Sequence, residues 1–295
     1  MQQQTIYQAL TLITPTAKMS ASVHGGRAKC LQRLIRLDMP VPRTMALSFD
    51  AVHQIAHGTL PDMAAVLAPF GEHPLVSVRP SSQDPDWGGP GAVLNIGMND
   101  ARYVDLCETM GKPAAAALYA RFVRAFAIHV ARLDPDEFDL PAHPTPDDLS
   151  AALAAYETET DSAFPQDPAQ QLGEVLRSMA RTWESTTARL LRQAKGAPAD
   201  AGLGLVVQAM ALGAGQGECG QGVMQFVDST TGQPKIVGRY ISEGKAKGYD
   251  VSPDTEGAIY LTHDPRGPAL EDICPAQYAQ LVSYGDICRR RLREE

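Results

Sequence analysis

Two stretches in the first third of the chain decide its predicted fold: Leu75-Val76-Ser77-Val78-Arg79 and Val93-Leu94-Asn95-Ile96-Gly97. The first is a short apolar run that ends on an arginine, which is typical of a buried strand. Residues 80–92, between the two, are rich in proline, glycine, serine and aspartate and predict a loop. Arginine suits phosphate because its planar guanidinium donates two parallel hydrogen bonds and keeps its charge. Arg79 is therefore a candidate phosphate ligand; the alternative is that it pairs with a carboxylate at the end of the strand.

Composition restricts the kind of protein. The chain has 295 residues, enough for two domains or one elaborate domain. Its net charge of −8 argues against nucleic acid or an anionic membrane as a partner. No apolar run approaches the ~18–20 residues that span a bilayer, and no secretory signal is visible. The 5 cysteines are scattered without a Cys-x-x-Cys pair, which predicts reduced thiols in a cytoplasmic protein and neither a zinc site nor a disulfide framework.

A second candidate anion site precedes the first predicted helix. Gly25 and Gly26 come just before Arg27, and apolar residues recur at helical spacing from Leu31 until the chain turns at residues 39–42. A glycine pair at the start of a helix lets the backbone approach an anion, which the free N–H groups of the first turn stabilise. Most glycine pairs mark only a tight turn, and the neighbouring cation Arg27 favours the anion site.

The middle of the chain is predicted to be helical. The alanine-rich segment 110–133 has apolar residues at four-residue steps, the pattern of one helix with a single apolar face. A connector rich in proline and aspartate, residues 134–148, leads into further helices that end near Gly196. His129 and His143 have no partners at metal-ligand spacing and are predicted to be structural or on the surface. The predicted core positions of the last of these helices are Leu172, Val175, Leu176, Met179 and Trp183.

Beyond Gly202 the pattern changes from helices to strands. The predicted strands cover residues 203–212, 223–227, 236–241 and 258–261. A helix is predicted over 275–295. The backbone N–H groups of the glycine-dense segment 213–222 can surround a triphosphate, although a mobile hairpin loop explains the glycines equally well. The segment matches neither the Walker pattern nor a strand–Gly-x-Gly-x-x-Gly–helix unit. The order of elements indicates an α/β fold with a helical insertion.

These pieces resemble, in order, the N-terminal nucleotide-binding domain of pyruvate phosphate dikinase and its relative phosphoenolpyruvate synthase. The matching blocks are residues 25–28, 37–42, 75–80, 94–100, 164–183, 206–210, 220–223 and 229–232. The resemblance extends from residue 21 to residue 284. It implies an ATP-grasp-like fold of the α/β (α+β) class, in which ATP lies between two lobes. In that family a phosphoryl group then passes to a histidine on a separate, swivelling domain.

The resemblance also implies a division of the chain and a set of site residues. Residues 1–108 correspond to the N-terminal ATP-grasp-like lobe, 109–200 to the helical insertion and 201–295 to a β-rich lobe that ends in a helix. The family's phosphate-binding arginine matches Arg79, and the lysine of its glycine loop matches Arg27. The nucleotide-binding residues implied in this way are Arg27, Arg79, Gly25, Gly26, Gln208, Gly220 and Gly222.

Several residues of the family are replaced here. Arg27 stands in place of a lysine, and a guanidinium fork is not equivalent to an ammonium at a phosphate. The loop over residues 80–90 keeps the family's length with different chemistry, residues 225–229 have lost an arginine, and Arg239 replaces an acid. The family's metal-binding Asp-x-Glu follows the helix with which this sequence ends. We therefore expect that this chain alone does not hold magnesium, which phosphoryl transfer needs.

Three functions are compatible with the sequence. The preferred one is a pyruvate phosphate dikinase-like ATP-binding domain that is non-catalytic on its own, a nucleotide-binding or regulatory module. The second is one half of a split phosphotransferase, in which a second polypeptide supplies the metal carboxylates and the phosphohistidine domain. The third is a protein-interaction scaffold that has lost nucleotide binding. The first is preferred because the replaced residues are spread over several loops, whereas a split enzyme should keep the lysine and the arginine.

Overall fold

The computed structural model describes residues 9–213, 219–228, 231–242 and 258–292. The chain divides into two compact units, the first made of residues 1–106 and 115–211 and the second of residues 107–114 and 212–295. Helices and sheets are mixed in the chain, which confirms the predicted α/β class. The division of the chain into a lobe, a helical insertion and a second lobe, with boundaries at residues 108 and 200, stays a prediction.

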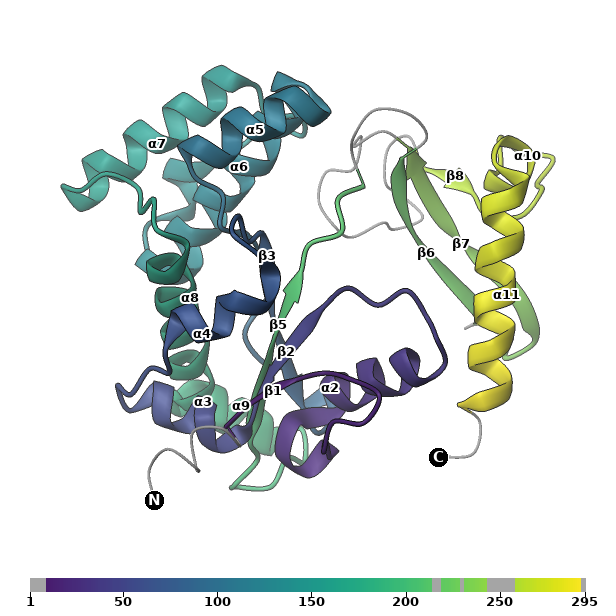
Figure 1. Ribbon diagram of the computed structural model, residues 1–295, viewed down its shortest axis with the longest axis horizontal. Helices are drawn as coiled ribbons and strands as arrows, with labels where there is room; N and C mark the ends of the chain where they lie inside the picture. The colour runs from purple at the N-terminus through teal and green to yellow at the C-terminus, as the bar shows by residue number, and fades with distance from the viewer. Residues whose placement is uncertain (1–8, 214–218, 229–230, 243–257, 293–295) are drawn as a thin grey trace. The chain divides into compact units, whose positions relative to one another are not determined.

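The first unit is built on a five-stranded sheet with the strand order β1-β2-β5-β3-β4 (Figure 1). All neighbouring strands in it are antiparallel. The strands are β1 (Leu10–Leu12), β2 (Thr44–Leu47), β3 (Val76–Ser82), β4 (Val93–Ile96) and β5 (Leu203–Ala209). β5 comes last in sequence and lies at the centre, between β2 and β3, where nearly all of its residues are buried. Its continuous apolar run is the pattern expected of a strand covered on both faces.

Strand β3 is longer than the sequence predicts. The loop was expected to begin at Pro80, but the ladder with β5 continues from Arg79, opposite Val206, to Ser82, opposite Leu203. Proline is tolerated here because β4 pairs with β3 no further than Val78, so the rest of β3 is an edge on that side. Arg79 therefore lies inside the strand and does not end it.

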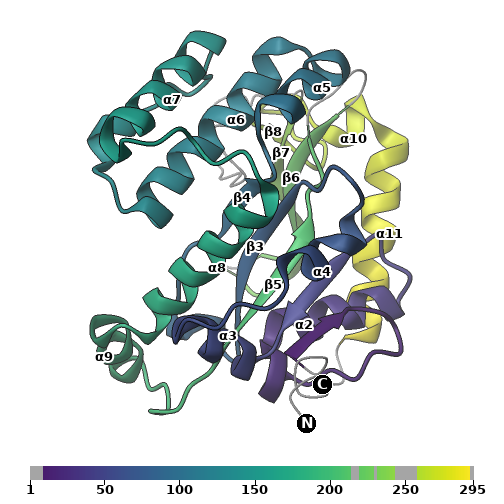
Figure 2. The same cartoon turned by 60° about the vertical axis from the view of Figure 1, so that its left-hand side comes forward.

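Helices cover both faces of this sheet. Helix α2 (Ala21–Arg36) packs against β2, β3 and β5, whereas α3 (Phe49–Ala56) and α8 (Pro168–Glu184) pack together on the other face (Figure 2). The five predicted core residues of α8 are all buried, which confirms the assignment of its apolar side to the core. The predicted helix breaks at Ser185, whose hydroxyl caps the short helix α9 (Thr186–Ala194) by accepting from the N–H of Ala188.

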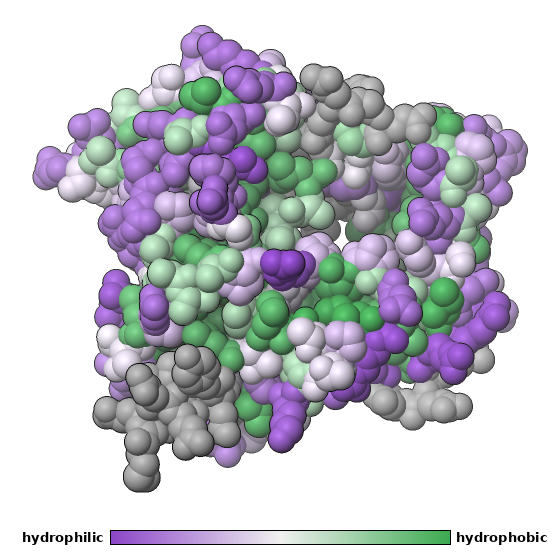
Figure 3. Space-filling model, in the orientation of Figure 1, coloured by the Kyte–Doolittle hydropathy of each residue, from purple (hydrophilic) through white to green (hydrophobic). Residues whose placement is uncertain are grey.

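The segment 110–133 is not the single helix that was predicted. It consists of the last residue of α5 (Asp100–Met110), helix α6 (Lys112–Phe126) and a π-helical turn, Ala127–Ala131. Gly111 separates the first two at a φ of 85°, a backbone conformation that glycine adopts without strain. The connector contains a 3₁₀ turn and leads into α7 (Pro146–Thr160). In Figure 3 the exposed side of α7 is mostly hydrophilic, as expected of a helix with one buried side.

One helix meets the length and composition of a membrane span, contrary to the expectation that no apolar run does. This is Lys112–Ala131, and half of its apolar window is buried inside the structure. Phe122 and Phe126 pack edge to face against Phe164, with ring centroids 5.6 and 5.3 Å apart. Such packing accounts for the apolar residues as those of a core helix. The cytoplasmic location stays a prediction.

The second unit contains an antiparallel sheet with the order β6-β7-β8 and two helices. These elements are β6 (Gly220–Val227), β7 (Pro234–Ser242), β8 (Ile259–Tyr260), α10 (Leu270–Ile273) and α11 (Pro275–Arg291). The three predicted strands and the final helix are thereby confirmed, with boundaries shifted by a few residues. Residues 214–218 of the glycine-dense segment, and residues 229–230 of the predicted turn, lie outside the described residues.

Candidate functional site

The glycine pair forms a break within α2. Gly25 has a φ of 84° and a ψ of 168°, so the helix stops there and a second helical segment starts at Gly26. A Cβ atom built on Gly25 would lie 1.7 Å from the carbonyl oxygen of Ser81, and one on Gly26 would lie 3.2 Å from the carbonyl oxygen of Gln83. Only glycine at position 25 permits this contact, which brings the start of the second helical segment against the end of β3.

Ser81 of β3 holds the two segments of α2 together. Its hydroxyl donates to the carbonyl oxygen of His24 over 2.7 Å and accepts from the N–H of Ala28 over 3.0 Å. The second bond resembles that of an N-cap, although the capping side chain comes from another element. Ser81 was predicted to lie in a loop and was missed as a site residue. Its position two residues after Arg79, on the same face of an extended strand, is the one signal for it in the sequence.

Arg27 and Arg79 are brought together at this place. The Nε atom of Arg27 donates to the carbonyl oxygen of Pro80 over 2.8 Å. Burial, and next the positive charge of Arg79, lower the pKa of Arg27 below its usual value. Within the described residues neither guanidinium forms an ion pair with a carboxylate. Two neighbouring cations without a carboxylate create a positive potential that a bound anion would relieve.

Gln208 lies on the same face of the sheet. In the β3–β5 ladder Gln208 is opposite Ser77, and Val206 is opposite Arg79. Side chains two residues apart in a strand point to the same face of the sheet, so all four lie on one face. Val206 packs with Ala28 of α2, which identifies the face as the one that α2 covers. The amide of Gln208 donates to the hydroxyl of Thr44 over 2.8 Å and is buried. Its described contact therefore links β5 to β2.

A cleft of about 500 Å³ opens between α2 and the segment after β3. Its volume is within the ~300–1,000 Å³ typical of small-molecule sites. The cleft is lined by Gly26, Arg27, Cys30, Leu31, Pro80, Ser81, Ser82, Pro85, Gly88 and Gly89. It thus has a cationic and hydroxyl-bearing part around Arg27 and an apolar part around Leu31 and Pro85.

Gly220 and Gly222 are strand residues and not part of a loop, which corrects the predicted setting of these two glycines. A Cβ on Gly220 would lie 2.3 Å from the hydroxyl of Tyr240, and one on Gly222 would lie 2.6 Å from the carbonyl oxygen of Arg239. Close packing of β6 on β7 therefore accounts for both. They belong to the second unit, so their place in a site with Arg27 stays a prediction.

His24 is a second residue that the sequence did not single out as functional. It is buried directly before Gly25, and burial lowers the pKa of its ring. A weaker interaction of the ring with the backbone of Ser20 opposes this shift, and the ring nitrogens have no further hydrogen-bond partner within the described residues. The imidazole is therefore neutral at physiological pH and contributes no charge to the cleft.

The described residues do not form a metal site. No group of three or more His, Cys, Asp and Glu side chains in these parts of the chain is placed to hold a metal ion. The expectation that this chain alone does not hold magnesium stays a prediction, because one or two carboxylates together with phosphate oxygens can hold this ion.

The comparisons with known proteins agree with the predicted resemblance. Over 92% of its length the chain is 25% identical to pyruvate, phosphate dikinase 1 of Arabidopsis thaliana and to pyruvate, phosphate dikinase of Clostridium symbiosum. The chain is related to the pyruvate, phosphate dikinases. The Rhizobium meliloti dikinase is 24% identical over the same share. No model of a protein family matches the chain. The relation confirms the predicted resemblance and supports an ATP-grasp-like fold for this dikinase-related domain.

The chain spans about a third of the length of these relatives, between 31% and 34% of each of the three. Their names refer to pyruvate and phosphate. These substrates are properties of the complete dikinases. For the dikinase-related domain the relation establishes a shared ancestry over nearly the whole chain. The ligand and the reaction are inferred below.

Proposed function

We propose that this domain binds ATP in the cleft between α2 and β3 and acts as a nucleotide-binding or regulatory module. The observation that carries the proposal is the pairing of Arg27 with Arg79 beside a cleft of about 500 Å³, with no carboxylate from the described residues on either cation. The relation to the dikinases, whose family uses ATP, supports the same ligand.

In this proposal the phosphates lie at the two arginines. Because Nε of Arg27 is bound to the carbonyl oxygen of Pro80, the guanidinium is held in place and its two terminal nitrogens are oriented for phosphate oxygens. The N–H groups that follow the break at Gly25 add positive partial charge from a helix start. Leu31 and Pro85 offer apolar surface to the base.

The proposal assigns binding, and not transfer, to these residues. A fork held by a backbone carbonyl keeps a phosphate in one geometry, whereas a flexible lysine ammonium follows a phosphate through a reaction. Phosphoryl transfer would require magnesium and an acceptor supplied by other groups. Completion of a phosphotransferase by a second polypeptide stays a prediction, as does the loss of nucleotide binding in favour of protein contacts.

Titration calorimetry of the chain with ATP tests the proposal. We expect Arg27→Gln to weaken ATP binding by roughly 10- to 100-fold, the effect of losing about 1.5–3 kcal/mol from hydrogen bonds to a charged group. Arg36→Gln is the matched control, since it removes the same charge from an exposed position near the other end of α2. Equal ATP affinity in the Arg27 and Arg36 variants, or no binding by the unmodified chain, would exclude this cleft as the nucleotide site.

A further inference from the structure

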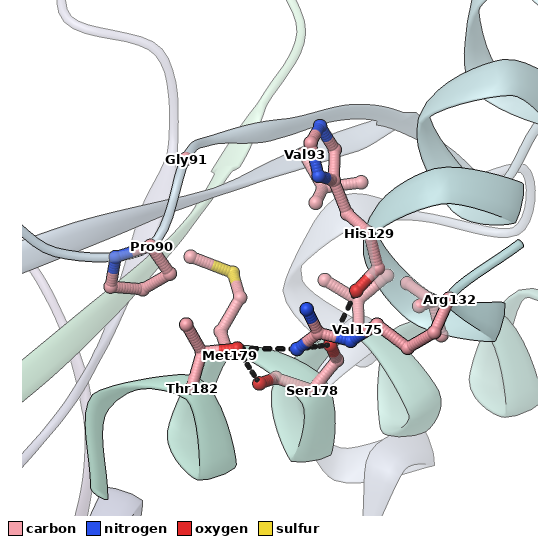
Figure 4. A pocket seen from close by; sticks show the side chains of 10 residues that line it. Pro90, Gly91, Val93, His129, Arg132, Val175, Ser178, Met179 and Thr182 are labelled. Carbon is pink, nitrogen blue, oxygen red and sulfur yellow. Dashed lines mark hydrogen bonds between the residues drawn. The ribbon is translucent and has the colours of Figure 1, made fainter. Parts of the chain in front are cut away.

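A second cationic pocket lies in the helical part of the first unit. It has a volume of about 60 Å³ and is lined by α8, by the π-helical turn and by the segment before β4 (Figure 4). Pockets for drug-sized ligands have roughly 300–1,000 Å³, so this one is limited to a small ion or molecule. Figure 4 shows Arg132 reaching across α8 toward Ser178 and Thr182, while His129 lies toward Gly91 and Val93.

An unusual backbone places these two side chains. The turn Ala127–Ala131 is π-helical, and Arg132, which ends it, has a φ of 64° in the left-handed region. Left-handed conformations are uncommon for residues other than glycine, and π-helical turns occur frequently at functional sites. The N–H of Leu133 closes the turn on the carbonyl oxygen of Ala127 over 3.0 Å. This costly local geometry brings His129 and Arg132 to the same pocket, which points to a function for it.

Hydroxyl groups of α8 orient the guanidinium of Arg132. Its Nη2 atom donates to the hydroxyl of Thr182 over 2.5 Å and to that of Ser178 over 3.3 Å. Ser178 itself donates to the carbonyl oxygen of His129 over 2.5 Å, and Thr182 donates to that of Ser178 over 2.8 Å. Both hydroxyl protons are thus engaged, and both oxygens present lone pairs to Arg132. Within the described residues all hydrogen bonds of this guanidinium involve Nη2, so Nε and Nη1 remain as donors.

The charge of the pocket is positive. Among the residues that the structure describes, no carboxylate forms an ion pair with Arg132 or with His129. Burial, and next the charges of Arg132 and of Arg124 on α6, lower the pKa of His129. The lining residues contributed by α8 and by residues 90–93 are uncharged. Arg132 therefore supplies the positive charge of the pocket, and no carboxylate of the described part of the chain pairs with it.

We propose that this pocket binds a small tetrahedral oxyanion, such as inorganic phosphate, between Arg132 and His129. Arg132 donates to it through the guanidinium nitrogens that its hydroxyl partners leave open. His129 becomes a second cationic donor when the dianion enters, because a nearby negative charge favours the protonated imidazole. The site shares no lining residue with the cleft at Arg27, although Gly89 of the cleft and Pro90 of the pocket are consecutive, and it does not depend on the proposed nucleotide function.

Calorimetric titration of the chain with sodium sulfate tests this proposal. Sulfate is the probe because it keeps a double negative charge over the whole pH range used. We expect binding by the unmodified chain and at least a roughly tenfold loss of affinity in Arg132→Asn and in His129→Gln. Asparagine tolerates the left-handed backbone of position 132, and the His129 change keeps the carbonyl that Ser178 uses. Acetate, which is planar and carries one charge, should bind more weakly than sulfate or phosphate.

Arg132 and His129 are themselves exposed, so two further variants test whether sulfate binds in this pocket, in the cleft at Arg27 or at an arginine of α8. Arg181→Gln removes an exposed arginine of α8 that does not line the pocket, and Arg27→Gln disables the proposed nucleotide cleft. Arg181→Gln should bind sulfate as the unmodified chain does, and in the Arg27→Gln background, where the cleft no longer competes for the anion, Arg132→Asn should still weaken sulfate binding. No sulfate binding by the unmodified chain would overturn the proposal. So would a loss of sulfate binding in Arg27→Gln with binding retained in Arg132→Asn, because the anion would then occupy the cleft.

The pH dependence of sulfate binding gives a readout that a purely structural role of His129 would not change. Because burial lowers the pKa of His129 in the free chain and a neighbouring anion favours its protonated form, the affinity for sulfate should rise as the pH falls from about 8 to about 5.5. His129→Gln should bind sulfate with a flat profile over this range. A rising profile in His129→Gln, equal to that of the unmodified chain, would contradict the assigned role of this histidine.

Discussion

Two glycine motifs of this chain look alike in sequence and differ in structure. Gly25 and Gly26 lie in a break of α2, where position 25 has a φ of 84°, whereas Gly220 and Gly222 lie in strand β6 without a positive φ. The first motif brings the start of a helical segment to Arg27, and the second brings two strands close together. A glycine-rich sequence therefore indicates close backbone approach in both places, and in the first case this approach brings a helix start to Arg27.

The largest effect expected from this comparison is that of Gly25→Ala. A side chain there would meet the Ser81 carbonyl at 1.7 Å and would occupy a backbone region that is almost exclusive to glycine. The strain of such a conformation is about 1–3 kcal/mol, and the clash adds to it. We expect a loss of unfolding free energy of more than about 2 kcal/mol in urea denaturation.

Gly26→Ala is the matched control for that variant. Its Cβ would lie 3.2 Å from the Gln83 carbonyl at an ordinary helical position, and alanine favours a helix over glycine by about 1 kcal/mol. Its stability should therefore stay within about 1 kcal/mol of the unmodified chain. Equal destabilisation by the two alanines would show that the break at Gly25 does not have the structural role assigned to it.

Gly220→Ala should have the next largest effect, confined to the second unit. The new Cβ would lie 2.3 Å from the hydroxyl of Tyr240 and 2.4 Å from the carbonyl oxygen of Ile241, so β6 and β7 must separate. Overpacking of this kind costs about 1–3 kcal/mol. Amide hydrogen exchange should become faster in β6 and β7 and stay unchanged in β5. Faster exchange in β5 alone would refute the assignment.

Ser81→Ala should destabilise the chain by about 1–3 kcal/mol, because it leaves the His24 carbonyl and the Ala28 N–H buried without their partner. Ser82→Ala is its control, since within the described residues that hydroxyl has one hydrogen bond, which it donates to the nearby Asp84 carbonyl over 2.8 Å. Thermal or urea unfolding of both variants makes the comparison. If the Ser82 variant lost as much stability as the Ser81 variant, the cap across the two elements would not be the stabilising contact.

The smallest expected effect concerns the pH dependence around His24. Burial lowers the pKa of this histidine in the folded chain below the usual value of about 6.5, so the unfolded chain binds the proton more tightly. Stability should therefore be fully present above about pH 6.5 and decrease as the pH falls below it. His24→Phe should reduce this slope in urea unfolding measured at several pH values. An unchanged slope would assign the pH dependence to other groups.

The sequence predicts the elements of the fold better than the contacts of the site. The apolar run of β5, the five buried positions of α8 and the strands of the second unit follow from hydrophobic periodicity, which is a local signal. The pairing of Arg27 with Arg79 was suggested by the family resemblance and not by spacing. What the sequence missed depends on contacts between distant segments.

Three features illustrate that limit. Ser81 acts as a cap only because Gly25 allows β3 to approach α2, and no local pattern contains that contact. Strand β3 continues through Pro80 because β4 stops pairing before it, which is a property of the sheet. The π-helical turn before Arg132 interrupts an alanine-rich segment whose periodicity predicted a continuous helix. In each case tertiary structure overrides local propensity.

Thermal unfolding with ATP in the absence of magnesium tests the central claim most directly, by comparing the unmodified chain with Arg79→Gln. A ligand at 100 times its dissociation constant adds about 2.7 kcal/mol to the stability of the form that binds it. We predict a rise in the melting temperature of the unmodified chain by roughly 5–10 °C and little or no rise in Arg79→Gln at the same ATP concentration. An equal rise in both proteins, or none in either, would contradict the assignment of the phosphates to Arg27 and Arg79.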